Sequence, residues 1–211
     1  DDLVYNMRAN LTCNIALFSM DEENERIKRH AKRGGLSAIY ENGYITICKG
    51  EWKLRISKAV NVPLTMGGRA AFMIQNILPA ALTAFVNDMT IEDIKVGLES
   101  FIPSPSQTPG RLNLFEFKNF TILLDYAHNP AGLRALQKLV ERMDGTPKIG
   151  IIAGIGDRRP EDNIEIGQIA AEMFDEVIIR QDKNLRGKTD KEIIDWLKKY
   201  LHVILERANV I

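Results

Sequence analysis

The sequence predicts an α/β protein with a parallel β-sheet in its second half. Three short runs there, "TILLD", "KIGIIAGI" and "EVIIR", are rich in apolar residues. Runs of this kind are typical of strands that are buried on both faces of a parallel sheet. Segments with helical signals follow each run, and strands that alternate with helices favour a sheet covered by helices on both sides. We therefore expect a small Rossmann-like domain in this half.

The first half is predicted to mix helices and strands. "AIYENGYITIC" at 38–48 is expected to form a hairpin, because Asn42 and Gly43 suit a tight type I′ turn between apolar alternations. Thr90 is expected to cap a helix that begins at "IEDIKVGLESF". The remaining elements are a strand at 14–19, a charged helix at 21–34 and a long helix at 69–86.

In the second half, helix caps define the elements that follow the strands. Pro130 suits the first turn of a helix, and Thr189 with Glu192 three residues later forms a capping box. The strands are expected at 121–125, 148–155 and 176–180, and the helices at 130–143, 164–173 and from 189 onward.

Composition limits the classes of function. Lys plus Arg equals Asp plus Glu at 28 each, so no global field favours nucleic acid or an anionic membrane as a partner. No apolar run approaches the ~20 residues of a membrane span, and no signal peptide is recognisable, which predicts a cytoplasmic protein. Cys13 and Cys48 lack further ligands at metal-binding spacing and are expected to be reduced thiols.

A proline-rich stretch divides the chain. "FIPSPSQTPGR" at 101–111 places three prolines among small polar residues, which favours a linker over a helix. The 211 residues are enough for one large domain or two small ones. We expect two domains, at 1–106 and 107–211.

Three polar clusters follow the predicted strands of the second half: "DYAHNP", "GIGDRRPED" and "RQDKNLRGK". Ligands of parallel α/β sheets bind beyond the carboxyl ends of the strands. Helix starts favour anions, and glycines such as Gly154 and Gly156 allow the backbone to approach a phosphate closely. The alternative interpretation of Asp125 and His128 is structural. A lone Asp or His in a turn between a strand and a helix is often a helix cap or a surface group.

The arginines of these clusters have two readings. Their planar guanidinium groups can bind phosphate or carboxylate through paired hydrogen bonds. Arg158 and Arg159 are equally able to form surface pairs with Glu161 and Asp162. The candidates for anion binding are Arg158, Arg159, Arg180 and Arg186.

The combination of these motifs resembles the Mur ligase superfamily. The resemblance is carried by "PGR" at 109–111, "LLDYAHNPAGL" at 123–133, "GIGDRRPED" at 154–162 and "DKNLRGK" at 182–188. Residues 62–84 resemble the end of the central ATPase domain of the family. The resemblance implies the end of that domain followed by a Rossmann-like Mur ligase C-terminal domain with a parallel sheet.

The resemblance also implies ATP-dependent amide synthesis with Mg²⁺. In the family, a carboxylate attacks the γ-phosphate of ATP, and an amine then displaces phosphate from the acyl phosphate. "GDRR" and "LRG" are similar to a branch that joins arginine to the aspartate side chains of a poly-aspartate backbone. The implied partners are arginine, aspartate, a polypeptide primer and further copies of the same chain, without nucleic acid or membrane.

Residue roles follow from the same resemblance. Asn76 matches the asparagine that meets the adenine of ATP, and Arg111 the arginine near its ribose and phosphates. Asp125 matches the aspartate that holds the ribose hydroxyls. His128 and Asn129 match the turn that faces the nucleotide and the interdomain cleft.

The incoming amino acid is implied to bind at Asp157, Arg158, Asp182 and Arg186. A guanidinium is bound well by carboxylates, so Asp157 and Asp182 are the expected partners of the arginine side chain. The arginines would then bind the carboxylate of the same substrate.

Departures from the family pattern leave other functions open. The chain has no G-x-x-x-x-G-K-[ST] loop, so the phosphate-binding lysine is expected upstream of Asp1. Leu3 stands where the family has a proline. We expect a fragment of a longer protein that is inactive alone. One alternative is a structural or polymer-binding module without catalysis. Another is a ligase for peptidoglycan precursors or folylpolyglutamate.

Overall fold

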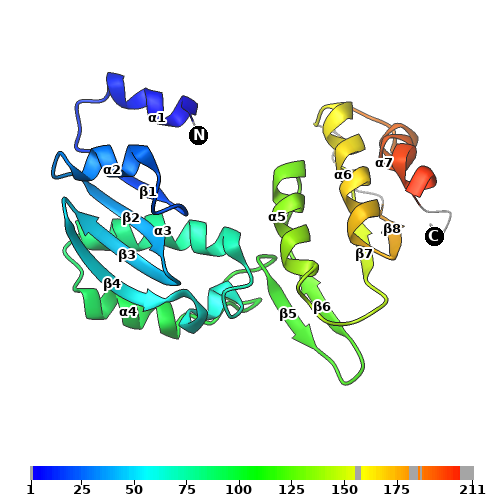
Figure 1. Ribbon diagram of the computed structural model, residues 1–211. Helices are drawn as coiled ribbons and strands as arrows, with labels where there is room; N and C mark the ends of the chain where they lie inside the picture. Colours follow the sequence, from blue (N-terminus) through cyan, green and yellow to red (C-terminus); the bar gives the residue numbers. More distant parts are fainter. Residues whose placement is uncertain (1, 155–157, 181–184, 186, 205–211) are drawn as a thin grey trace. The chain divides into compact units, whose positions relative to one another are not determined.

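The computed structural model describes residues 2–154, 158–180, 185 and 187–204, the last five of them by their helical backbone alone. The chain divides into two compact units, Asp1–Ile102 and Pro103–Ile211 (Figure 1). The division falls at the start of the proline-rich stretch 101–111. Each unit has a core of its own.

The first unit contains a mixed four-stranded sheet. Its order is β1 (Ala16–Ser19), β2 (Leu36–Glu41), β3 (Tyr44–Lys49) and β4 (Trp52–Lys58). β1 and β2 run parallel, and the other neighbours are antiparallel. The predicted hairpin is confirmed, because Asn42 and Gly43 have φ values of 50° and 83°, as a type I′ turn requires.

The helices of this unit are α1 (Asp2–Met7), α2 (Glu25–Ala31), α3 (Ala71–Val86) and α4 (Ile91–Ser100), with short 3₁₀ turns η1 (Arg8–Asn10), η2 (Ala59–Asn61) and η3 (Pro63–Thr65). α2 packs on one face of the sheet, and α3 and α4 pack on the other. The Thr90 hydroxyl accepts a hydrogen bond from the Asp93 amide at 3.1 Å, so the predicted cap of α4 is confirmed.

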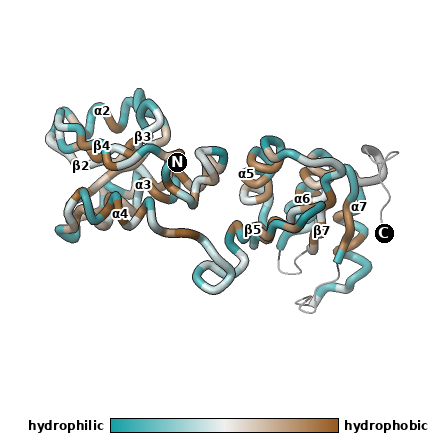
Figure 2. Tube along the Cα trace, turned by 90° about the horizontal axis from the view of Figure 1, so that it is seen from below, coloured by the Kyte–Doolittle hydropathy of each residue, from teal (hydrophilic) through white to brown (hydrophobic). Residues whose placement is uncertain are grey.

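Adjacent residues of β2 point to opposite faces of the sheet. Ala38 packs into the main core with Leu78 of α3, whereas Ile39 packs with Ile27 of α2 and with Cys48. The hydrophobic stretches of the strands and of α3 gather inside the unit (Figure 2). Burial raises the pKa of the Cys48 thiol, so this residue remains a neutral packing group.

The second unit contains two pairs of strands. β5 (Asn113–Glu116) and β6 (Thr121–Leu124) are antiparallel, and β7 (Ile149–Ile152) and β8 (Glu176–Ile179) are parallel. The parallel pairing of the last two strands is confirmed. β6 instead pairs with β5, a strand that the sequence analysis did not predict. The two join through a tight turn, in which the Phe117 amide donates to the Phe120 carbonyl at 2.9 Å.

Three helices complete this unit: α5 (Pro130–Val140), α6 (Pro160–Met173) and α7 (Asp190–Ile204). α6 begins four residues before the predicted start, because Pro160 suits the first helical position. The capping box of α7 is confirmed, since the Thr189 amide donates to Glu192 at 2.9 Å and the Glu192 amide donates to Thr189 at 3.3 Å. 

One apolar cluster connects all the layers of the second unit. Leu123 of β6, Ile152 of β7 and Ile179 of β8 pack against buried residues of α5, α6 and α7. Gly167 permits the close contact between α6 and α7, because a Cβ there would lie 2.1 Å from the Leu197 carbonyl oxygen. The polar turns of the unit are therefore attached to a single packed body.

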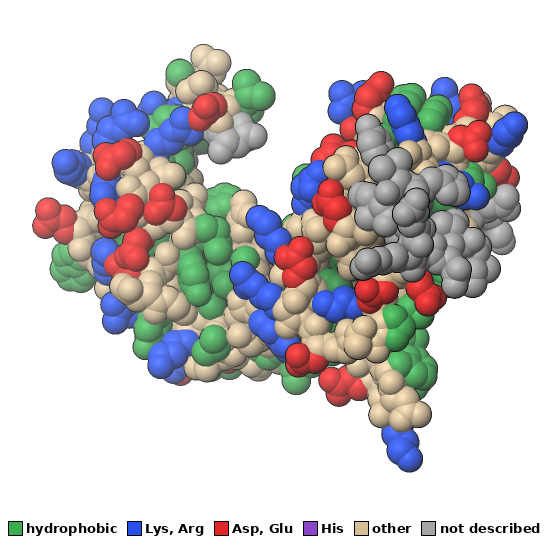
Figure 3. Space-filling view, turned by 45° about the vertical axis from the view of Figure 1, so that its right-hand side comes forward, with side chains coloured by type: hydrophobic (Ala, Val, Ile, Leu, Met, Phe, Trp, Pro, Cys, Tyr) green, Lys and Arg blue, Asp and Glu red, His purple; other side chains and the backbone are tan. Residues whose placement is uncertain are grey.

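The face of the molecule in Figure 3 carries charges of both signs. Basic and acidic side chains are interspersed over the face shown in Figure 3, in agreement with the balanced composition. Within the described parts of the chain, no helix combines the length and the apolar character needed to span a bilayer.

Leu78→Ala is expected to lower the free energy of unfolding by about 2 to 5 kcal/mol, because the side chain is fully buried in the main core. Chemical denaturation of the variant measures this loss. Val86→Ala on the same helix is the control, since Val86 is 54% exposed. Equal effects of the two substitutions would contradict the packing described for α3.

Candidate functional site

The turn that follows β6 contains three of the residues assigned to the nucleotide, and a fourth lies beside it. Asp125 comes directly after β6, and His128 and Asn129 precede α5. Arg111 belongs to the loop that leads into β5. The fifth residue, Asn76, lies on α3 of the first unit.

Asp125 joins the loop that contains Arg111 to the turn before α5. One carboxylate oxygen accepts a hydrogen bond from the Leu112 amide at 3.0 Å, and the other accepts from the Ala127 amide at 2.8 Å. The carboxylate therefore ties the Arg111 loop to the turn before α5. A carboxylate has about four lone-pair positions, so these two bonds leave acceptor capacity for a further ligand.

The Tyr126 ring contacts both Arg111 and His128. The Arg111 guanidinium lies 5.0 Å from the centre of the Tyr126 ring, and the ring centres of Tyr126 and His128 are also 5.0 Å apart. His128 Nδ1 is 3.0 Å from the Tyr126 carbonyl oxygen. Because a carbonyl only accepts, Nδ1 must carry the proton in this contact. In the neutral ring, Nε2 is then left as an acceptor.

Asn129 is the N-cap of α5. Its side-chain oxygen accepts a hydrogen bond from the Gly132 amide at 2.7 Å, and Pro130 occupies the first helical position. The first turn of a helix presents its other free amides to solvent, and these attract anions. Asn129 therefore caps the helix, a structural role of the kind that the sequence analysis raised for Asp125 and His128 in the same turn.

The sequence analysis missed two residues of this site. Tyr126 stands within the quoted "DYAHNP" motif, so its place between Asp125 and His128 was the available signal. Asn113 is 1% exposed beside the Arg111 loop. It falls outside every quoted motif, and no sequence signal identified it.

In the second polar cluster, "GIGDRRPED", Arg159 forms an ion pair with a described residue. Arg159 binds the Asp162 carboxylate through two nitrogens at 2.8 and 3.3 Å, and this hydrogen bonding lowers the pKa of Asp162. The surface-pair reading of Arg159 is therefore confirmed. Arg158 is half-buried, and its Nε has no hydrogen-bond partner among the described residues.

Three of the four residues assigned to the amino-acid substrate, Asp157, Asp182 and Arg186, lie outside the described residues, as does Gly156. Gly154 is described, and it serves packing: a Cβ there would lie 2.2 Å from the Ile193 side chain. The exposed Arg180 follows β8, where its amide donates to the Ile152 carbonyl at 2.8 Å. The ends of β7 and β8 therefore lie at the same edge.

A small pocket in the first unit includes Asn76 at its rim. Its volume is about 250 Å³. Asn76 is exposed, and its amide makes a long contact of 3.9 Å with the Met73 sulfur. The other lining residues are Val62, Leu64, Ile77, Ala80, Gly97, Leu98 and Phe101. The pocket is thus apolar with one amide available for hydrogen bonding.

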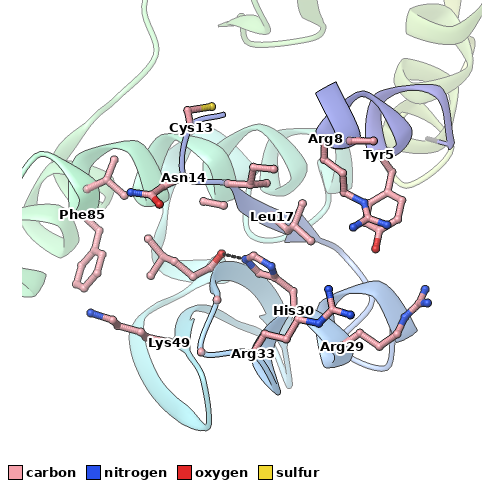
Figure 4. Close-up of a pocket in the computed structure, with 17 residues that line it drawn as sticks. Tyr5, Arg8, Cys13, Asn14, Leu17, Arg29, His30, Arg33, Lys49 and Phe85 are labelled. Atoms are coloured by element: carbon pink, nitrogen blue, oxygen red, sulfur yellow. Dashed lines mark hydrogen bonds between the residues drawn. The ribbon is translucent and has the colours of Figure 1, made fainter. Parts of the chain in front are cut away.

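A larger pocket of about 920 Å³ opens beside β1 (Figure 4). Arg8, Arg29, Arg33 and Lys49 line it, and no carboxylate occurs among its described lining residues. His30 points its Nε2 at the Leu36 carbonyl, 3.0 Å away. None of the described residues assigned to nucleotide or substrate lines this pocket.

No group of three or more His, Cys, Asp or Glu side chains is arranged for metal binding among the described residues. Mg²⁺ is commonly held by one or two carboxylates together with the phosphates of a substrate, so a Mg²⁺ ion bound with a nucleotide would need fewer protein ligands than such a group.

Asn129→Ala is expected to lower the free energy of unfolding by about 1 kcal/mol, because the Gly132 amide loses its capping partner. Asn129→Asp, which keeps an acceptor at the same position, is the matched control and is expected to retain most of the stability. Thermal unfolding compares the two variants. A loss in Asn129→Asp as large as that in Asn129→Ala would contradict the capping role.

Comparison with known families identifies the second half of the chain. Residues 110–211 match the family described as "Mur ligase, glutamate ligase domain". The chain is 48% identical to the cyanophycin synthetase of Geminocystis herdmanii over 209 residues, which is 99% of the chain and 24% of that protein. For the cyanophycin synthetase of a Nostoc species, the identity is 48% over 188 residues, with coverages of 89% and 21%.

A diaminopimelate ligase named UDP-N-acetylmuramoyl-L-alanyl-D-glutamate--2,6-diaminopimelate ligase, from Geobacillus kaustophilus, is more distant. It is 32% identical over 125 residues, covering 59% of the chain and 24% of that protein. The chain thus spans about a fifth to a quarter of the length of these relatives.

Solved structures agree on the fold. Folylpolyglutamate synthase from Thermotoga maritima has a TM-score of 0.59 at 19% identity, covering all of the chain and 50% of that protein. MurF from Acinetobacter baumannii has a TM-score of 0.55 at 17% identity, with coverages of 92% and 41%. Residues 110–211 thus match the Mur ligase family model, and the chain is homologous to part of the cyanophycin synthetases, with 48% identity over 99% of its length.

Proposed function

We propose that the chain is part of an ATP-dependent ligase of the cyanophycin synthetase type. The proposed reaction joins the amine of arginine to the aspartate side-chain carboxylate of a poly-aspartate primer. Residues 1–106 would be the end of the central ATP-binding domain, and residues 107–211 the C-terminal domain. The identity of 48% to cyanophycin synthetases, against 32% to a diaminopimelate ligase, supports this choice of substrates.

The observation that carries the proposal is the clustering of Arg111, Asp125 and the start of α5. Arg111 offers a cation for the phosphates, and the amides at the start of α5 favour anions. The free lone pairs of Asp125 suit two vicinal ribose hydroxyls. Folylpolyglutamate synthase of Mycobacterium tuberculosis, with a TM-score of 0.57 at 16% identity, was solved as a complex with ADP.

The pocket beside Asn76 suits an adenine base. Its apolar walls can pack against the faces of a purine. A side-chain amide offers both a donor and an acceptor, which match the edge of adenine that carries its amino group. Asn76 is therefore proposed to recognise the base.

The proposed chemistry has two steps. A carboxylate oxygen bonds to the γ-phosphorus of ATP as the bond to ADP breaks, and the arginine amine then bonds to the acyl carbon as phosphate leaves. Both steps develop charge on phosphate oxygens, which a cation such as Arg111 stabilises. Arg158, Arg186, Asp157 and Asp182 are proposed to bind the incoming arginine.

The phosphate-binding lysine and the ligands of Mg²⁺ are proposed to come from other parts of the full-length protein. Bound Mg²⁺ would neutralise phosphate charge in this chemistry. The chain contains no G-x-x-x-x-G-K-[ST] loop, and its described residues offer no cluster of metal ligands. We therefore expect no turnover by the 211-residue chain alone. The resemblance to the family implies a homo-oligomer as the full-length form.

Phosphate release by the full-length protein tests the proposal. The assay contains ATP, Mg²⁺ and a short aspartate-rich primer, with arginine, with aspartate, with both or with neither. Arginine-dependent release together with arginine incorporation into the primer is the expected result. Release that ignores arginine would contradict the proposal and favour a structural or polymer-binding role, whereas release that depends on another amino acid would identify a different ligase.

Arg111→Ala is expected to raise the KM for ATP by about 10- to 100-fold, because a hydrogen bond to a charged phosphate is lost. Steady-state kinetics of the full-length protein measures this change. Arg134→Ala is the matched control, since Arg134 is occupied by Glu165 at 3.1 Å on the surface of α5. An unchanged KM in Arg111→Ala would contradict the nucleotide assignment.

A further inference from the structure

Asn113 organises the loop that carries Arg111. Its side-chain oxygen accepts a hydrogen bond from the Gly110 amide at 2.7 Å. Its side-chain nitrogen donates to the Thr108 carbonyl at 3.0 Å and to the Arg111 carbonyl at 3.3 Å. The residue is 1% exposed, so these three bonds form out of contact with water.

The loop needs such support because its backbone is strained. Gly110 and Leu112, on either side of Arg111, have φ values of 69° and 49°. The left-handed region is easily reached by glycine but is unfavourable for a branched residue such as leucine. Strained backbone persists only where the surrounding structure holds it. Here the two holding groups are the Asn113 amide and the Asp125 carboxylate, which accepts from the Leu112 amide at 3.0 Å.

We infer that Asn113 is a positioning residue that fixes Arg111 for binding the phosphates of the nucleotide. The inference rests on the proposed function, in which Arg111 contacts the nucleotide. Asn113 itself is buried behind the loop and acts through Arg111. The side-chain amide of Asn113 suits this position because it both accepts and donates hydrogen bonds. Only such a group can accept from a backbone amide and donate to two backbone carbonyls at once.

Two substitutions separate this role from general stability. Asn113→Ala removes all three bonds. Asn113→Asp keeps the size and the acceptor for Gly110 but replaces the donor by an acceptor that faces two carbonyls. In the full-length protein, both are expected to raise the KM for ATP by about five- to twenty-fold while kcat changes less than about two-fold, because the loss is one of binding.

A double-mutant cycle makes the test sharper. If Asn113 acts through Arg111, Asn113→Ala adds little to the KM once Arg111 has been replaced, so the double variant resembles Arg111→Ala alone. If Asn113 served only the stability of the fold, the two substitutions would raise the KM independently. Their fold-changes would then multiply in the double variant. Thermal unfolding of each variant verifies that the measured protein is folded, and Asn113→Asp serves in the cycle if Asn113→Ala does not fold.

The outcomes test the positioning role of Asn113 separately from the assignment of Arg111 to the nucleotide. A raised KM in Arg111→Ala with multiplying effects of Asn113 substitution, or with no effect of it, overturns only the positioning role. An unchanged KM in Arg111→Ala overturns the assignment of Arg111 to the nucleotide and the inference with it. A raised KM in both single variants without further increase in the double variant is the expected result.

Discussion

The carboxylate of Asp125 binds two backbone amides that belong to different segments of the second unit. One amide, that of Leu112, lies in the loop before β5, and the other, that of Ala127, lies in the turn before α5. Charged acceptors form stronger hydrogen bonds than neutral ones. Together with the pairing of β5 and β6, this side chain sets the place of Arg111 relative to the start of α5, and the proposed nucleotide site depends on that place.

Packing makes this junction rigid. Leu123, two residues before Asp125, and Leu133 of α5 share one apolar cluster with α6 and α7. Glycines allow its layers to approach: at Gly150, a Cβ would lie 2.2 Å from the Phe174 ring. The turn between strand and helix is consequently held at both ends, while the exposed Arg111 remains open to a ligand.

Local signals explain which features were predictable from the sequence. The turn at Asn42 and Gly43 and the cap at Thr90 depend on the chemistry of one or two residues, and both are present as predicted. β5 was not predictable in the same way, because four residues with mixed polarity become a strand only by pairing with β6. The roles of Asp125 and Asn113 in holding the loop arise from contacts that only the folded chain creates.

The most direct test is the structure of the full-length protein with ADP or a non-hydrolysable ATP analogue bound. Our account predicts the ribose hydroxyls within hydrogen-bond distance of Asp125 and the Arg111 guanidinium on the phosphates. The loop at 108–112 should keep the hydrogen bonds that it makes here to Asn113 and Asp125. A nucleotide bound away from the turn after β6 would contradict the account.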